Sequence, residues 1–584
     1  MADPIRIANC SGFFGDRLAA AREMVEGGPI DVLTGDWLAE LTMLILARTR
    51  MKRPNGGYAR TFVTQMEQVM GSCLERGIKV VSNAGGLDPE ACANDIAEVA
   101  KKLGLNPKIA FVRGDDLMPR IDQLLESDKL RHFETGDPIK DADFLTANAY
   151  LGCWGIVDAL NRGADIVVTG RCTDAAIVCG PAAWHHGWSR TDWNALAGGV
   201  AAGHVIECGT QTTGGNYSFF TEVKGLTHTG FPFAEVAADG SSVIGKHDGT
   251  GGEVSVGTVT SQLLYEIGGP QYFGPDVTTR FDTIELEQVG RDRVRMHGIQ
   301  GEPPPPTLKV CINRAGGFRN SMTACLTGLD IEAKAKLIED AFWEACPYKP
   351  SDYAQVSTRL MRTDHEDPAS NEEAVAMFRI TVKDPDQKKV GRVFANAMTE
   401  LALATIPGFF GVGGGPGEGS PFGVYVPACI PSELVTQEVV ILGGDRREVS
   451  SVIPTADVKV TPTPGPTAKA PTGATKRAPL GAVFGSRSGD KGGNANLGVF
   501  ARSDEAFAWL DGFLTEQKLR ELLPEVASMP IDRHRLASLR SLNFVIHGLL
   551  EEGVAASTRQ DGQAKSLGEW LRARHVDLPE ALLR

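Results

Sequence analysis

The sequence predicts an α/β protein with a mainly parallel N-terminal sheet carrying helices on both faces, then a middle α+β domain and a small C-terminal α+β domain. Three observations predict it. Short apolar strands alternate with amphipathic helices over about the first 170 residues. The order of predicted strands and helices changes after the proline run at 303–306. A segment rich in Pro and Thr covers residues 453–480. At 584 residues the chain is also too long for a single hydrophobic core.

The first domain is expected to span residues 1–300. Five short runs of apolar and β-branched residues predict its strands: residues 5–8, 30–33, 78–81, 109–112 and 166–169. Asp88 followed by Pro89 marks a helix start, and apolar residues continue at helical spacing to Gly104. Another helix is expected over 151–160. Strands that alternate with helices imply right-handed crossovers and a mainly parallel sheet.

The remaining chain is expected to form two further domains joined by a linker. In residues 301–452 the expected order is strand, strand, helix, strand, strand, helix: 308–312, 321–326, 330–342, 356–361, 377–382 and 389–406. Residues 453–480 hold six prolines and six threonines, a composition that cannot bury enough surface to fold alone. Residues 481–584 are expected to open with a hairpin, followed by a helix, a strand and a helix: 506–523, 542–546 and 567–575.

The composition of the chain disfavours several classes of partner and site. The net charge is −14 and no long basic run occurs, so we expect no nucleic-acid partner. No apolar window is long enough for a membrane span, and no secretory signal opens the chain, so we expect a cytoplasmic protein without a membrane partner. The 11 cysteines contain no CxxC pair and are interpreted as reduced thiols, with no metal site.

No standard cofactor motif is present. The glycine-rich run 411–419 gives GxGxxG in no register and follows a helix, so it is interpreted as a mobile or ligand-covering loop. GxxxxGK[ST], HExxH and GxSxG are absent, which leaves ATPase, zincin and α/β-hydrolase functions without support. We therefore expect no cofactor.

Candidate site residues follow the predicted parallel strands, whose carboxyl ends meet at one edge of the sheet. They combine small, hydroxyl, amide and charged side chains: Asn9, Ser11, Asp36, Asn83, Gly85, Gly86, Asp115, Arg171 and Asp174. Asp36, Asp115 and Asp174 are the candidate acid/base groups, and Arg171 is a candidate anchor for an anionic substrate. Each loop alone is also typical of a plain turn with a helix cap, and Arg171 in a structural ion pair with a neighbouring Asp is an equal alternative. Glu207, Cys208 and Gly209, with residues 212–216, are a candidate further face of the same pocket, in which Cys208 is either a thiol nucleophile or an inert buried thiol.

A second candidate lies in the stretch GSRSGDKGGNANLGVF, residues 485–500. Arg487, Asp490, Lys491 and Asn494 stand among glycines that allow positive φ and expose backbone N–H groups. This pattern favours an anion-binding loop. The alternative is a solvated hairpin turn with a weak local ion pair.

Several of these strings occur together in one family. NCSGFFGDR (9–17), DVLTGDWLAELTM (31–43), NAGGL (83–87), GADIVVTGRCTD (163–174) and SGDKG (488–492) resemble the acyclic terpene utilisation (AtuA-like) family over nearly the whole chain. The resemblance implies a ferredoxin-like C-terminal domain. It also implies a place in the catabolism of a branched acyl-CoA or its carboxylate, as in citronellol-type terpene degradation, but it supplies no catalytic residues to transfer.

The leading hypothesis is thus a catabolic enzyme that acts on a branched acyl-CoA or related carboxylate by hydratase, lyase or isomerase chemistry. The expected partners are a small-molecule substrate, with a CoA thioester as one candidate, and further copies of the chain in a homo-oligomer. The hairpin of residues 485–500 is expected to close on the strand-end crevice, from its own chain or from a partner's. The alternative is a non-catalytic subunit that binds acyl-CoA or assembles pathway enzymes.

Overall fold

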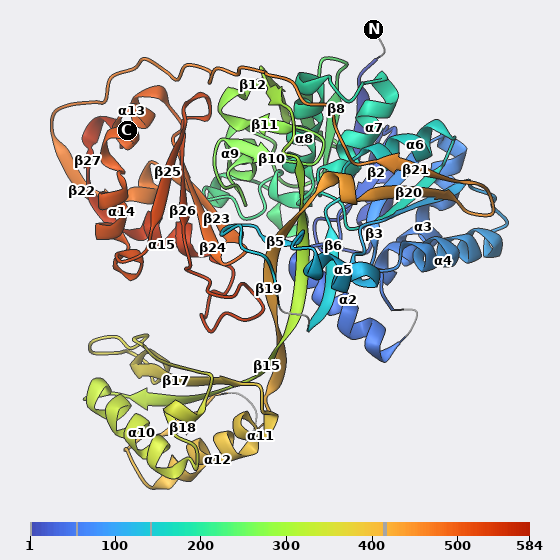
Figure 1. Cartoon of the computed structure of the whole chain (residues 1–584). Coiled ribbons are helices and arrows are strands. Elements are labelled where there is room, and N and C mark those ends of the chain that lie inside the picture. The colour runs from blue at the N-terminus through green and yellow to red at the C-terminus, as the bar shows by residue number, and fades with distance from the viewer. Residues whose placement is uncertain (1–2, 54–55, 141–142, 413–416, 584) are drawn as a thin grey trace. The chain divides into compact units, whose positions relative to one another are not determined.

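A computed structural model describes residues 3–53, 56–140, 143–412 and 417–583 (Figure 1). Internal contacts divide the chain into two compact units: Met1–Asn313 with Tyr425–Val554 and Gln563–Arg584, and Arg314–Val424 with Ala555–Gly562. The segment predicted as one domain, 301–452, is therefore shared between the units, and the division into folding domains stays a prediction. The centre of the glycine-rich run, 413–416, lies outside the described residues.

The first unit is built on an eleven-stranded sheet in the order β12-β13-β9-β8-β1-β2-β3-β7-β4-β20-β21. Its five central strands pair in parallel: β1 (Ile5–Asn9), β2 (Val32–Gly35), β3 (Lys79–Gly86), β7 (Ile166–Gly170) and β4 (Ile109–Arg113). Antiparallel strands extend it: β8 (Pro232–Val236), β9 (Ser242–Lys246), β13 (Arg293–His297), β12 (Glu285–Gly290), β20 (Thr436–Ile441) and β21 (Arg446–Ser450). The α/β class and the five predicted strands are confirmed, whereas the antiparallel extensions were not predicted.

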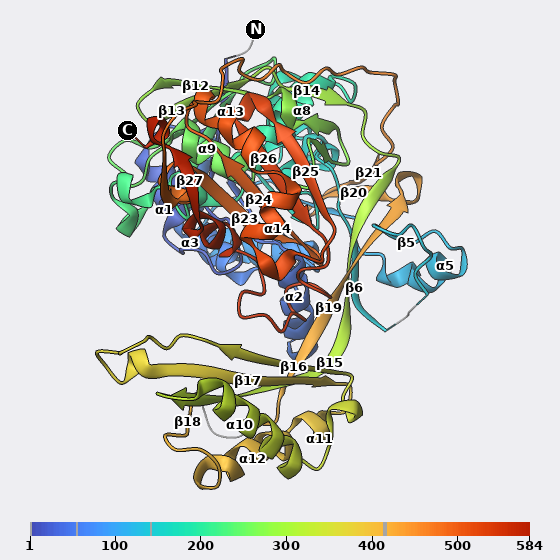
Figure 2. The ribbon, with the colours of Figure 1, turned by 90° about the vertical axis from the view of Figure 1, so that its left-hand side faces the viewer.

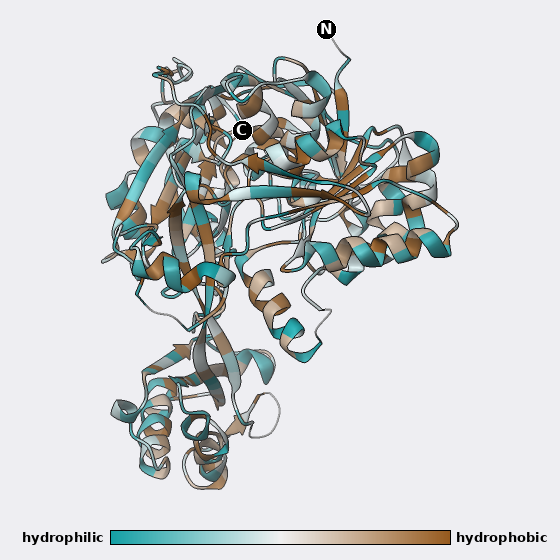
Figure 3. Ribbon diagram, turned by 45° about the vertical axis from the view of Figure 1, so that its right-hand side comes forward, coloured by the Kyte–Doolittle hydropathy of each residue, from teal (hydrophilic) through white to brown (hydrophobic). Residues whose placement is uncertain are grey.

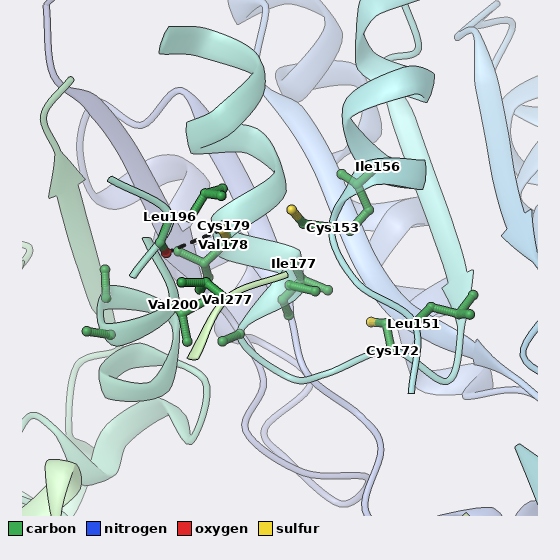
Figure 4. Close-up of a cluster of buried hydrophobic side chains, with 14 of the residues drawn as sticks. Leu151, Cys153, Ile156, Cys172, Ile177, Val178, Cys179, Leu196, Val200 and Val277 are labelled. Carbon is green, nitrogen blue, oxygen red and sulfur yellow. Dashed lines mark hydrogen bonds between the residues drawn. The ribbon is translucent and has the colours of Figure 1, made fainter. Parts of the chain in front are cut away.

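Helices cover both faces of the parallel centre because its strands are apolar on both sides. Neighbouring residues alternate between two cores, so that Val32 and Val81 face one and Leu33 and Val80 face the other. The first core is closed by α6 (Trp154–Asn161), α7 (Ala176–His186) and α8 (Trp193–Ile206). The second is closed by α1 (Ala20–Gly27), α3 (Arg60–Arg76) and α4 (Pro89–Lys102). Figure 4 shows part of the first core, where residues of α6, α7 and α8 interdigitate.

Local signals in the sequence set the helix ends. Asp88 caps α4 as predicted, since its Oδ1 accepts a hydrogen bond from the Ala91 amide at 3.0 Å. Figure 3 shows hydrophobic residues concentrated along the central strands and hydrophilic residues on the outer turns of the surrounding helices. No described helix is long and apolar enough to cross a membrane.

The second unit contains a sheet with helices on one face. β17 (Val375–Asp384) pairs with β16 (Gln355–Met361) and with β15 (Thr307–Thr327), while α10 (Ile331–Ala345) and α12 (Arg392–Glu400) pack against it (Figure 2). The strands predicted at 308–312 and 321–326 are parts of the single strand β15, which begins in the first unit. The helix predicted at 389–406 divides at Gly391 into α11 (Gln387–Val390) and α12.

The C-terminal part of the first unit has a four-stranded antiparallel sheet. Its order is β23 (Gly485–Lys491), β24 (Asn494–Phe500), β26 (Ser541–Ile546) and β25 (Ile531–Leu536). α13 (Asp504–Phe513), α14 (Glu516–Leu522) and α15 (Leu567–Ala573) accompany this sheet. Residues 453–473, inside the predicted linker, contain neither helix nor strand.

The predicted hairpin is confirmed, but most of its glycines serve packing rather than a flexible loop. Residues 485–491 and 494–500 are strands, and only Gly492 in the turn between them has a positive φ, of 64°. A Cβ on Gly489 would lie 2.5 Å from the Tyr265 ring, and one on Gly498 would lie 2.6 Å from Leu264 Cβ. The interpretation of Gly489 and Gly493 as positive-φ residues is therefore wrong: the close approach of neighbouring atoms excludes a side chain there.

We predict that Gly498→Ala destabilises the protein by about 1–3 kcal/mol, because its methyl group overpacks the buried Leu264. Thermal unfolding followed by tryptophan fluorescence measures the change. The control is Gly512→Ala in α13, where an added Cβ meets no atom within 4 Å. That variant should gain about 0.5–1 kcal/mol. Equal unfolding temperatures for the two variants would contradict the packing argument.

Candidate functional site

The ends of β2, β3 and β7 bring predicted site residues together. Asn83 Nδ2 donates to Asp36 Oδ1 at 2.5 Å, and Asn83 Oδ1 accepts from the Trp37 amide at 2.8 Å. Asp36 is only 5% exposed. The amide of Asn83 thus fixes the buried Asp36 carboxyl at the edge where the carboxyl ends of the strands meet.

Arg171, directly after β7, is almost completely buried at 2% exposure. Its Nη1 donates to Asp174 Oδ1 at 2.8 Å and to the Leu38 carbonyl at 3.0 Å. Its guanidinium carbon lies 4.2 Å from the centre of the Tyr150 ring. The structural ion pair foreseen as an alternative is therefore present, but Arg171 Nε has no hydrogen-bond partner among the residues that the structure describes. One N–H group of this cation remains free for a ligand.

Asp115 holds the loop of Arg171 in place. It accepts hydrogen bonds from the Arg171 amide at 2.9 Å and from Asn148 Nδ2 at 2.8 Å. Burial raises the pKa of Asp115 to about 7, although both hydrogen bonds oppose the rise. These contacts are those of a residue that positions the Arg171 loop. The acid/base role of Asp115 stays a prediction.

Glu207, predicted only as part of a further face of the pocket, lies at the end of α8. It is 5% exposed, its Oε1 is 3.3 Å from His204 Nδ1 and its Oε2 has no partner. Asn9 Nδ2 donates to the carbonyls of Ile206 and Glu207 at 2.7 and 2.9 Å, so the predicted Asn9 fixes this helix end.

Repulsion among buried carboxyls favours their protonated forms. Burial, followed by the charges of Asp174 and Glu207, raises the pKa of Asp36 well above its ordinary value. Burial, followed by Asp174 and Glu266, does the same for Glu207. Two carboxyls with raised pKa values thus interact with Asp174, which is ion-paired with Arg171.

A second charged group contains residues that sequence reasoning did not select. Tyr150 Oη donates to Glu40 Oε1 at 2.6 Å, and Lys309 Nζ donates to the same oxygen at 3.1 Å. Burial favours a raised pKa for Glu40, but Lys309, Arg171 and the Tyr150 hydrogen bond outweigh it and lower the pKa. The side chains of Glu40 and Lys309 are 30% and 31% exposed, so solvent reaches this group.

The C-terminal hairpin contributes a cation to the cluster. Lys491 Nζ donates to the Glu266 carbonyl at 2.6 Å, and the Glu266 amide donates to Asn496 Oδ1 at 2.9 Å. Burial, and then the charge of Lys309, lowers the pKa of Lys491. Burial, and then the charge of Glu266, raises the pKa of Asp490 to about 8.

Two other predicted residues of the hairpin attach it to its surroundings. Arg487 hydrogen-bonds Gln211, and its guanidinium carbon lies 4.1 Å from the centre of the Tyr265 ring. Asn494 Nδ2 donates to Glu134 Oε1 at 2.7 Å. These contacts orient β23 and β24, so that Asp490 and Lys491 are held by a fixed framework.

The remaining predicted residues have local structural contacts. Ser11 Oγ donates to the Phe13 carbonyl at 3.1 Å. A Cβ on Gly85 would lie 2.5 Å from the Thr169 carbonyl oxygen, and Gly86 has a φ of 52°. Burial, followed by the charge of Glu207, raises the pKa of the Cys208 thiol well above its ordinary value, which favours the inert alternative.

Buried polar atoms without partners gather in this cluster. Among the described residues, these atoms include Arg171 Nε, Glu207 Oε2, His204 Nε2, Gln262 Oε1 and Tyr425 Oη. Leaving such groups unpaired costs about 1–3 kcal/mol each, so their concentration makes this cluster the candidate site for a polar ligand or water. In the part of the chain that the structure describes, no group of three or more His, Cys, Asp or Glu is arranged to hold a metal ion.

Comparison with family models covers most of the chain. The model described as acyclic terpene utilisation family protein AtuA matches residues 5–441, and the AtuA ferredoxin-like domain matches residues 478–577. No curated protein and no solved structure matches the chain. The expected family and the ferredoxin-like C-terminal domain are thereby confirmed.

We predict that Lys491→Met raises the pKa of His204. Burial and then the Lys491 charge hold that pKa at about 4, against an ordinary value of 6.5. Removing the charge should therefore shift it upwards, which a pH titration of ¹⁵N-histidine resonances measures. Lys476→Met, at an exposed position of β22 (Thr475–Pro479), is the control and should leave it unchanged. An unshifted His204 in Lys491→Met would contradict the placement of the hairpin.

A second prediction concerns stability and pH. Asp115 has an ordinary pKa of 3.8 and a folded pKa of about 7, so the folded state binds more protons between these values. Its contribution to stability is full below about pH 4 and is lost as the pH rises through 7, by up to about 1.4 kcal/mol per pH unit. Asp115→Asn should flatten this part of the profile, measured as unfolding temperature from pH 5 to 8. If the unfolding temperature of Asp115→Asn depends on pH as steeply as that of the wild type, Asp115 is not the cause of this pH dependence.

Proposed function

Because the chain belongs to the acyclic terpene utilisation AtuA family, we propose that it is a catabolic enzyme acting on a branched acyl-CoA or the related carboxylate. The reaction we propose is of the hydratase, lyase or isomerase class. These classes share one step, the addition or removal of a proton at a carbon near a carboxylate or thioester. The residues needed for that step are a proton donor, a proton acceptor and groups that bind the anionic end of the substrate.

The observation that carries the proposal is the contrast among neighbouring carboxyls. Burial and like charges raise the pKa values of Asp36 and Glu207, whereas Asp174 is ion-paired with Arg171. Pairs of titratable groups whose environments differ in this way are typical of acid/base catalysis. We assign the proton donor to Glu207, whose Oε2 is unpaired, and the acceptor to Asp174.

Arg171 and Lys491 act on the Glu207 carboxyl, and Lys309 acts on Lys491 from beside Glu40; these three cations support an anionic substrate. Arg171 retains an unpaired Nε, Lys491 belongs to the C-terminal hairpin, and Lys309 lies over the Tyr150 ring with Nζ 4.8 Å from its centre. A carboxylate or an enolate-like oxygen formed during proton transfer would be stabilised by such preorganised donors. Asp36 and Asn83 would orient the substrate.

Proton exchange tests the proposal whatever the final product is. The full chain is incubated in D₂O with branched unsaturated acyl-CoAs and the corresponding free acids, and mass spectrometry follows incorporated deuterium and the mass of added or lost water. Deuterium at carbon in at least one substrate supports the proposal. Stabilisation of the protein by acyl-CoA with neither exchange nor turnover would favour the non-catalytic binding subunit instead.

We predict that Glu207→Gln lowers turnover by about 10²–10⁴-fold, since an amide cannot supply a proton. Glu207 carries its proton below its raised pKa, so wild-type activity should fall as the pH rises through that value, and the variant should lack this alkaline limb. Initial rates from pH 5 to 10 measure both effects. Glu287→Gln, on the exposed strand β12, is the matched control and should retain wild-type rates. An unaltered alkaline limb in Glu207→Gln would remove Glu207 from the proposed role.

A further inference from the structure

Helix α2 (Glu40–Lys52), labelled in Figure 1, begins inside the charged cluster of the candidate site. The carbonyl of Leu38, two residues before the helix, accepts a hydrogen bond from Arg171 Nη1 at 3.0 Å. Glu40, the first helical residue, accepts one from Lys309 Nζ at 3.1 Å. The start of α2 is thus attached to the buried guanidinium on one side and to the Lys309 amine on the other.

The opposite end of α2 carries four cations within six positions, Arg48, Arg50, Lys52 and Arg53. All but Arg48 are exposed. Among the residues that the structure describes, no acidic side chain forms an ion pair with any of the four. The helix dipole accounts for Arg50 and Lys52 in the last turn, whereas Arg48 and Arg53 add charge outside that turn. Because the whole chain has a net charge of −14, this excess of positive charge is a local feature.

Arg50 places this end of the helix at the edge where the carboxyl ends of the parallel strands meet. Its Nη1 donates to the carbonyl of Leu87, directly after β3, at 3.4 Å. Burial raises the pKa of Asp116, three residues after β4, and the Met118 amide and then the charge of Arg50 oppose that rise. Asp116 offsets at most one of the four charges. The cations therefore lie beside the loops that follow β3 and β4, on the same edge of the sheet as the candidate site.

The length of α2 sets the distance between the cluster and these cations. Ten to thirteen residues separate Glu40 from Arg50 and Arg53, which at about 1.5 Å per residue is about 15–20 Å. The pantetheine arm of CoA spans about 15 Å from its sulfur to its nearest phosphate, because three single bonds of an extended chain span about 3.5 Å. An acyl-CoA therefore reaches both ends of α2, whereas a free branched carboxylate has no charged group for the far end.

We propose that the cations at the end of α2 bind the phosphate groups of a CoA thioester whose acyl end lies beside Arg171. This inference rests on the proposed function and narrows its substrate to the thioester. Guanidinium groups bind phosphate oxygens through pairs of hydrogen bonds, and Lys52 adds a flexible point charge. Since most of these side chains are exposed, salt screens them, and the affinity for the phosphates depends on ionic strength.

Calorimetric titration of the full chain with CoA and with pantetheine tests the proposal. Pantetheine has the same arm but no phosphate. We expect CoA to bind at least about tenfold more tightly than pantetheine at low salt, and the difference to shrink as the salt concentration rises. Equal affinities, a difference that does not depend on salt, or no CoA binding at millimolar concentration would overturn the proposal.

Matched variants locate the phosphate groups. Arg50→Gln and Arg53→Gln should each weaken CoA about 3- to 10-fold and leave pantetheine unchanged. Lys101→Gln removes one charge from the last turn of α4, where the side chain is 80% exposed, and should leave both affinities unchanged. A merely structural effect would lower both affinities together. Unchanged CoA affinity in both arginine variants, or an equal loss for CoA and pantetheine, would refute the assignment.

These titrations separate the phosphate site from the proposed reaction. CoA carries no acyl group, so its binding is measured without turnover. Deuterium exchange into free acids without CoA binding would overturn the phosphate site alone. CoA binding of the expected kind, with neither exchange nor turnover of any acyl-CoA, would support the phosphate site and contradict the proposed reaction alone.

Discussion

The buried guanidinium of Arg171 is the interaction on which the candidate site depends. It is paired with Asp174, stacked on Tyr150 and held through its own amide by Asp115. It also lowers the pKa of Glu40 and limits the rise in the pKa values of Asp36 and Glu207. Removing one partner of a buried ion pair costs about 3–5 kcal/mol, because the other charge remains buried and uncompensated. The charges around Arg171 thus form one electrostatic unit.

The part of this unit that lies at the strand ends was predictable from sequence. Parallel strands followed by polar loops must bring those loops to one edge, and this rule alone placed Asp36, Asn83 and Arg171 together. The three-residue spacing of Arg171 and Asp174 was enough to foresee their ion pair. The rule does not predict how deeply these loops are buried, and it is burial that raises the pKa of Asp36 well above its ordinary value.

The sequence did not reveal the roles of other residues in the charged cluster, for identifiable reasons. Glu207 closes a helix whose apolar residues look like a plain core helix, and its role depends on Asn9, almost 200 positions earlier in the chain. Lys309 lies inside a strand, where the alternation of polar and apolar residues predicts an ordinary exposed side chain. The glycines of 485–500 were misinterpreted because sequence does not distinguish a glycine needed for φ from one needed for close packing. In all three cases the role of the residue depends on contacts between segments that are distant in the sequence.

The hairpin explains why the site needs two regions of the chain. The strand-end loops gather Asp36 and Asp174 beside Arg171, and Glu207 at the end of α8 adds another carboxyl, so that burial and the neighbouring negative charges raise the pKa values of Asp36 and Glu207. Burial raises the pKa of Glu207, and Lys491 limits that rise without forming an ion pair with it, since the Lys491 amine donates a hydrogen bond to a backbone carbonyl. A cation held in this way can still respond to a bound anion. The hairpin therefore opposes, through Lys491, the rise in the pKa of Glu207.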